Sequence, residues 1–120
     1  MNLLWADWPA PPHIKALCTT RQGGVSSAPF AQLNLGDHVG DAPQAVLENR
    51  QLLLNSLSLV KPAQWLKQVH GVEVVEACSD QQIRQADACY TTEPGVACVI
   101  MTADCLPVLF TNRSGSNVAA

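Results

Sequence analysis

The feature that most constrains this chain is a long apolar run near its C-terminus, ACVIMTADCLPVLF, residues 97–110. Short apolar runs rich in branched residues are typical of buried strands. The polar residues Asp104 and Cys105 interrupt the run, and a carboxylate is costly to bury without partners. The interruption therefore needs a reason. Either the run is two strands joined by a plain turn, or the polar dipeptide is directed at a ligand.

Composition defines a broad class of protein. The chain has 120 residues, of which 48% are apolar and 14% charged, enough for one domain with a core. The net charge is −3 and Lys and Arg do not cluster, which argues against a nucleic-acid partner. The opening MNLLWADWPAPP lacks a basic segment and is broken by Asp7 and prolines. It predicts neither a signal peptide nor a membrane anchor.

The cysteines predict a reducing compartment. Their number is odd and none forms a CxxC pair; they are Cys18, Cys78, Cys89, Cys98 and Cys105. Without a secretory signal, this usage predicts reduced thiols in a cytoplasmic protein, most of them serving as small core residues.

The N-terminal half predicts a strand, a loop and a helix. Residues 13–21 alternate as a strand, and Gly23 and Gly24 follow as turn residues. Asp41 and Pro43 predict the start of a helix over about residues 42–57, with Asp41 as its N-cap. Its expected buried face contains Val46, Leu47, Leu53, Leu54 and Leu57, while Glu48, Asn49, Arg50 and Gln51 are expected to point away.

The C-terminal half predicts further strands. Residues 63–70 and 72–77 are β-type runs separated by Gly71, and the polar residues 79–87 are compatible with a short helix. A turn is expected at residues 94–95, and NRSGS predicts a hairpin turn before a strand that opens at residues 117–120. We expect a mixed fold, α/β or α+β, that continues into a longer domain.

Two residues at predicted strand ends, His70 in QVHG and Cys105 in TADC, could carry chemistry. The imidazole could activate the thiol as a nucleophile, or both could ligate zinc or copper. Equally, Cys105 could be a small buried residue and His70 an ordinary turn residue. Asp104 could either stabilise the turn or orient His70 or a metal-bound water.

Three loop residues are weaker candidates. Arg21 precedes two glycines and could clamp phosphate or a carboxylate, or simply be solvated. Asn34 and His38 are expected to make hydrogen bonds within their loop, and a role as substrate contacts is the second interpretation. Asp87 and Trp65 are expected to be structural.

Six blocks occur in order from about Trp8 to Ala120: TTRQGGVSSAPF, LNLGDHVGD, ENRQLL, WLKQVHG, QADACYTTEPG and MTADCLPVLF. Together they resemble the YfiH-like family, also called the laccase-domain or multicopper polyphenol oxidase family, whose members are described as purine nucleoside phosphorylases. The resemblance implies a mixed α/β (α+β) fold with layered sheets and flanking helices, similar to that of cysteine hydrolases. Residues 1–120 would be the N-terminal part of one such domain, incomplete at its C-terminus.

The resemblance also implies a single metal ion, usually zinc, with copper as the alternative. Its ligands would be the histidine of QVHG, the cysteine of TADC and a second histidine. The first two are His70 and Cys105, whereas the third belongs to an HAGWRG-type motif expected beyond residues 117–120. The implied activity is phosphorolysis of adenosine, inosine or guanosine to the base and ribose 1-phosphate. Adenosine deamination and methylthioadenosine phosphorolysis accompany it in relatives.

Residue chemistry, rather than a family motif, gives the remaining roles. Asp104 would carry a proton, Arg21 would bind phosphate, and Asn34 and Gln68 would bind the nucleoside. Three alternatives stay open. One is a hydrolase of a peptidoglycan-precursor amide with Cys105 as nucleophile and His70 as base, and another is copper-dependent phenol oxidation. The third is an inactive partial domain that is completed by its missing half or self-associates.

Overall fold

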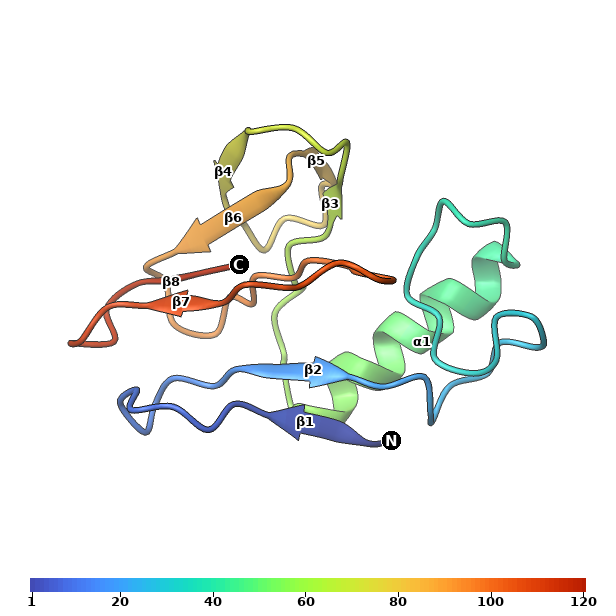
Figure 1. Ribbon diagram of the computed structural model, residues 1–120, viewed down its shortest axis with the longest axis horizontal. Helices are drawn as coiled ribbons and strands as arrows, with labels where there is room; N and C mark the ends of the chain where they lie inside the picture. The colour runs from blue at the N-terminus through green and yellow to red at the C-terminus, as the bar shows by residue number, and fades with distance from the viewer. The chain divides into compact units, whose positions relative to one another are not determined.

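The computed structural model describes all residues, 1–120, and forms two compact units (Figure 1). Unit 1 contains Met1–Asp7 and Lys15–Leu59, and unit 2 contains Trp8–Ile14 and Val60–Ala120. Eight short strands and one helix confirm the predicted mixed α/β class. They are β1 (Leu3–Trp5), β2 (Leu17–Thr19), α1 (Pro43–Ser56), β3 (Leu66–Lys67), β4 (Val74–Glu76), β5 (Arg84–Gln85), β6 (Ala88–Thr91), β7 (Phe110–Thr111) and β8 (Val118–Ala119). The helix is too short to cross a membrane.

Unit 1 combines the antiparallel β1–β2 hairpin with α1. The helix confirms the expected range to within one residue at each end, and Pro43 occupies its first turn. The predicted cap is wrong: Ala42 is the N-cap residue and no side chain caps the helix. The carboxylate of Asp41 instead accepts hydrogen bonds from Ser26 Oγ (2.6 Å) and Asn34 Nδ2 (3.0 Å). Its Oδ1 also accepts the N–H of the N-cap residue Ala42 at 2.8 Å, but no amide of the first helical turn.

The predicted buried face of α1 is also partly wrong. Val46 and Leu53 are buried as expected, but Leu47 is exposed and the polar Asn49 and Arg50 are buried. Arg50 donates from Nε and Nη2 to the carbonyl of Leu35, at 3.0 and 2.8 Å. Burial lowers the pKa of Arg50, and the charge of Asp37 opposes this shift. A polar helix face is stable here because loop carbonyls need donors.

Asn49 is the centre of these contacts. Its Nδ2 donates to Ser26 Oγ (2.8 Å), Gln32 O (3.2 Å) and Asn34 O (2.8 Å). Its Oδ1 accepts the N–H of Val25 at 2.8 Å. One fully buried amide therefore fixes the loop between β2 and α1.

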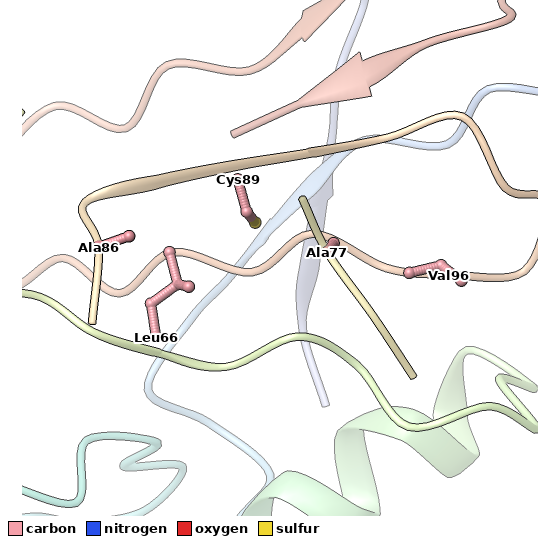
Figure 2. Packing of buried hydrophobic residues seen from close by; sticks show 5 residues of the cluster. All are labelled: Leu66, Ala77, Ala86, Cys89 and Val96. Atoms are coloured by element: carbon pink, nitrogen blue, oxygen red, sulfur yellow. The ribbon is translucent and has the colours of Figure 1, made fainter. Parts of the chain in front are cut away.

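Unit 2 is built on a four-stranded sheet in the order β4-β6-β8-β7. The pair β4–β6 is parallel, and β8 is antiparallel to both β6 and β7. The hairpin predicted from NRSGS is confirmed, and Asn112 Oδ1 accepts the N–H groups of Ser116 and Asn117 across its turn. The core beneath the sheet is small (Figure 2). It contains Leu66, Ala77, Ala86, Cys89 and Val96.

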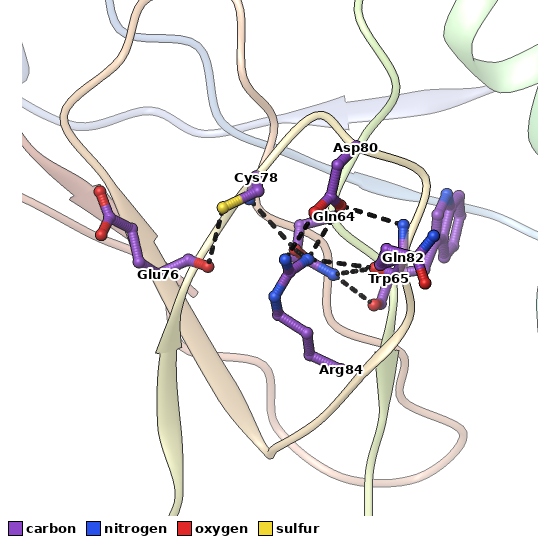
Figure 3. Close-up of polar contacts among 7 residues, drawn as sticks. All are labelled: Gln64, Trp65, Glu76, Cys78, Asp80, Gln82 and Arg84. Atoms are coloured by element: carbon purple, nitrogen blue, oxygen red, sulfur yellow. Dashed lines mark hydrogen bonds and ion pairs between the residues drawn. The ribbon is translucent and has the colours of Figure 1, made fainter.

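A second, parallel pair in unit 2, β3–β5, is supported by a buried polar network (Figure 3). Gln64 is fully buried; its Nε2 donates to Gln82 O (2.9 Å), and its Oε1 accepts from Arg84 Nη1 (2.7 Å). Arg84 also pairs with Asp80 at 2.6 Å. These hydrogen bonds hold the pKa of the Asp80 carboxyl well below its usual range. The short helix considered for residues 79–87 is absent, because this region forms a turn and β5.

Several predicted strands are shorter than expected. The run 13–21 contributes only Leu17–Thr19, and 63–70 only Leu66–Lys67. The apolar run 97–110 is extended but pairs only at an isolated bridge at Cys98 and at the start of β7. Its break is confirmed as an exposed bend at residues 103–105.

Candidate functional site

Gln68 joins the two segments that lead to QVHG and TADC. Its Nε2 donates to the carbonyl of Met101 at 2.9 Å, and its Oε1 accepts the Met101 N–H at 2.7 Å. Upstream, Gln64 forms a parallel bridge with Cys98, and the Gln64 N–H donates to Ala97 O at 3.0 Å. Residues 64–68 and 97–101 therefore run side by side in the same direction. At this point the hydrogen bonds of the Gln68 side-chain amide take the place of backbone hydrogen bonds between the two segments.

His70 lies two residues beyond this contact, in a turn held by one carboxylate. Asp87 accepts three successive backbone N–H groups, from Val69 (3.2 Å), His70 (2.9 Å) and Gly71 (2.8 Å). His70 adopts φ 59°, a left-handed conformation that is uncommon for residues other than glycine. The hydrogen bond from Gly71, together with those from the other two amides, holds the pKa of Asp87 below its usual value. Partial desolvation of the carboxylate acts in the opposite direction and raises this pKa. The imidazole is thus presented on a fixed, exposed turn.

Cys105 lies four residues beyond Met101 in the exposed bend, and its thiol is free. The thiol donates to Asp104 Oδ1 at 4.0 Å, a long and weak contact even for sulfur. This exposure rules out the interpretation of Cys105 as a buried small residue. The chain does not gather three or more His, Cys, Asp or Glu side chains in a group that could hold a metal ion.

Arg21 and Asn34 belong to unit 1, whereas Gln68, His70, Asp104 and Cys105 belong to unit 2. Arg21 Nε and Nη2 both donate to the carbonyl of Ala31, at 2.9 and 2.6 Å. Asn34 exchanges hydrogen bonds with Gly36 and donates to Asp41. Both side chains therefore build the loop, and their contacts with substrate stay predictions.

The prediction that Asp87 is structural is confirmed, because Asp87 holds the backbone turn on which His70 sits. Asp87 lies directly before a strand and comes close to the Val-His-Gly turn only in the folded chain. The sequence around Asp87 therefore gives no local signal of this role.

Two other thiols also lie close together. Cys89 is buried in the core and Cys98 packs against it. The hydrogen bond with Cys89, with burial, raises the pKa of Cys98, which favours the protonated thiol.

The fold and the site together define a class: a mixed α/β protein in which paired segments lead to an exposed histidine and an exposed cysteine. Residues 15–120 match the family model described as multi-copper polyphenol oxidoreductase laccase. The chain belongs to this family, as the sequence blocks predict.

Curated relatives share the match. The chain is 59% identical over 117 residues to a purine nucleoside phosphorylase of Pseudomonas aeruginosa, covering 98% of this chain and 47% of that protein. It is 47% identical over 120 residues to the purine nucleoside phosphorylase YfiH of Escherichia coli, covering 99% and 49%. The chain thus spans about half the length of these relatives.

Solved structures agree. A Neisseria meningitidis protein of the DUF152 family superposes with a TM-score of 0.93 at 48% identity, covering 99% of this chain and 49% of that one. YlmD from Geobacillus stearothermophilus gives a TM-score of 0.79 at 33% identity, covering 96% and 47%. The predicted family and mixed α/β fold are therefore confirmed.

Proposed function

We propose that this chain takes part in the phosphorolysis of purine nucleosides, with His70 and Cys105 as ligands of a catalytic metal ion. The names of the curated relatives supply the reaction class. The observation that carries the site is the double hydrogen bond between Gln68 and the backbone of Met101. It joins the two segments from which the histidine and the cysteine project.

The register of these segments supports a shared site. They are paired at the bridge between Gln64 and Cys98 and again at the Gln68–Met101 contact. Beyond that contact both segments leave the extended path, because His70 lies in the turn held by Asp87 and Cys105 lies in the bend at residues 103–105. His70 follows the contact by two residues and Cys105 follows it by four, on neighbouring segments.

The donor set suits the proposed metal. Imidazole nitrogen and thiolate sulfur are ligands of zinc and of copper ions. Because His70 and Cys105 are two donors, a closed site needs at least one more ligand from elsewhere. When bound, zinc would supply electrostatic stabilisation as a Lewis acid.

The residues of the chain can be given roles in a balanced reaction. A phosphate oxygen attacks ribose C1′, the C1′–N bond breaks, and its electron pair leaves with the purine, which takes up a proton. We assign the proton carrier to Asp104, which already contacts the thiol of Cys105. Arg21 is proposed to bind phosphate through Nη1, because its Nε and Nη2 are engaged by Ala31. Asn34 and Gln68 are proposed to contact the nucleoside.

The test is phosphate-dependent release of the base from inosine, adenosine and guanosine by the longest native form of the protein. His70→Ala and Cys105→Ala should each lower the rate by at least about 100-fold and remove bound zinc. Cys78→Ala replaces a cysteine outside the proposed site, and should leave both unchanged. Full activity in either site variant would refute the proposal.

Two further functions have specific support. The description of the family model favours copper-dependent oxidation of phenols. The exposed, free thiol of Cys105 favours a cysteine hydrolase with His70 as base. Phenol oxidation that requires added copper identifies the first. For the second, iodoacetamide should inactivate a metal-free enzyme by alkylating Cys105, with loss of amide hydrolysis.

A further inference from the structure

The four-stranded sheet of unit 2 has two unequal faces. Residues paired across strands lie on the same face, and successive residues alternate between faces. Cys89 pairs with Val75 and points into the core, where it is fully buried. Tyr90, the next residue, points the other way and shares a row with Ala119 and Phe110.

That opposite face is open and mostly apolar, with one charged member, the exposed Glu76 of β4, which pairs with Tyr90. Val74 of β4 is 57% exposed and Phe110 of β7 is 59% exposed, with Tyr90 of β6 between their strands (Figure 1). The segment before β7 continues the pattern: Leu106, at 86% exposed, and Val108 alternate with half-buried neighbours. We call this surface, comprising Val74, Tyr90, Leu106, Val108 and Phe110, the open face.

Such a face normally has a cover. Antiparallel pairs such as β6–β8 can leave a polar face to water, but large apolar side chains dominate this face. Residues 106–109 are extended but belong to no sheet, and they carry apolar side chains on both faces. A contiguous exposed apolar surface of this kind marks an interaction site.

The comparisons indicate what covers it. Over 99% of its length, the chain superposes on the Neisseria meningitidis protein, but this match covers only 49% of that protein. The relatives therefore carry a further stretch of polypeptide of about the same length. We propose that the open face is the interaction surface for the polypeptide that corresponds to the relatives' second half, whether joined to this chain or separate. This inference does not depend on the proposed activity.

The probe is the second half of the Pseudomonas aeruginosa relative, co-expressed with residues 1–120 as a separate, tagged polypeptide. We expect a 1:1 complex by light scattering. Phe110→Asp and Tyr90→Asp should each weaken it by at least about tenfold, because a charge at a buried apolar contact must be desolvated. Val60→Asp is the matched control: Val60 is 96% exposed in the same unit and outside the sheet. It should change the affinity less than about twofold.

Circular dichroism of each free variant checks its folding. Should an aspartate variant fail to fold, hydrogen exchange of the unmodified chain replaces it: residues 106–110 and β6 should gain protection on binding. Equal affinity of Phe110→Asp and the unmodified chain would overturn the proposal, as would unchanged exchange in the complex. A homodimer that Phe110→Asp disrupts, with no binding of the probe, would instead assign the face to a second copy.

Discussion

Replacing Asn49 by leucine should destabilise unit 1 strongly. The Asn49 side chain is fully buried, accepts one hydrogen bond and donates three, all to the loop between β2 and α1. Leucine has the same branched shape and the same number of side-chain heavy atoms, so the substitution removes polar contacts without opening a cavity. The Asn34 carbonyl and the Val25 N–H lose the partner that Asn49 supplies, whereas the Gln32 carbonyl keeps the N–H of Ser26.

The magnitude follows from these contacts. The two N–H groups of the amide share three acceptors, so with the bond to Oδ1 the side chain makes the equivalent of three hydrogen bonds. At about 1 kcal/mol each they represent about 3 kcal/mol of stability. The apolar leucine side chain recovers about 1 kcal/mol through burial. The expected net loss is therefore about 2 kcal/mol of unfolding free energy, a large part of the stability of a small domain.

Urea unfolding followed by circular dichroism at the helix band measures this loss, because α1, which holds Asn49, is the only helix. Glu48→Leu is the matched control on an exposed position of the same helix, and should change stability by less than about 0.5 kcal/mol. Equal midpoints for the two variants would refute the argument that this amide holds the loop.

Further predictions concern packing, acid stability and thiol reactivity. Gly24→Ala should lower the melting temperature, because an added Cβ would lie 2.4 Å from the Gln32 carbonyl oxygen; calorimetry tests this, and an unchanged midpoint argues against the tight approach. The pKa of Asp80 is lowered in the folded chain, so its contribution to stability is complete above pH about 4 and is lost as the pH falls below that value. Asp80→Asn should flatten the acid side of a stability–pH curve, and a curve that keeps its slope contradicts the assignment. Mass spectrometry after brief alkylation should find Cys105 modified first and Cys89 last, and the reverse order would contradict their exposures.

Local signals in the sequence predicted local structure well. Pro43 and the apolar spacing placed α1 within one residue, and NRSGS placed the β7–β8 turn. Both features depend on residues that are adjacent in the chain. The same reasoning predicted that Asn49 and Arg50 would point away from the core, which is wrong. Their burial depends on carbonyls of a loop that is distant in sequence.

The sequence proposes residues for the candidate site but not the contacts that support them. His70 and Cys105 stand out as reactive types beside turn residues. The amide of Gln68 pairing with Met101, and Asp87 holding the His70 turn, are contacts between distant segments. Their sequence neighbourhoods carry no sign of them, because only the folded chain brings these groups together.

The proposed function requires His70 and Cys105 to bind the same metal ion. Titration with cobalt(II), a spectroscopic substitute for zinc, measures this binding, because a thiolate ligand gives an intense charge-transfer absorption. We expect this absorption in the unmodified chain, its loss in Cys105→Ser, and an affinity at least about tenfold weaker in His70→Ala. Cys78→Ser should retain it. Charge-transfer absorption that survives Cys105→Ser, or an affinity that His70→Ala leaves unchanged, would show that the two residues do not share a metal ion.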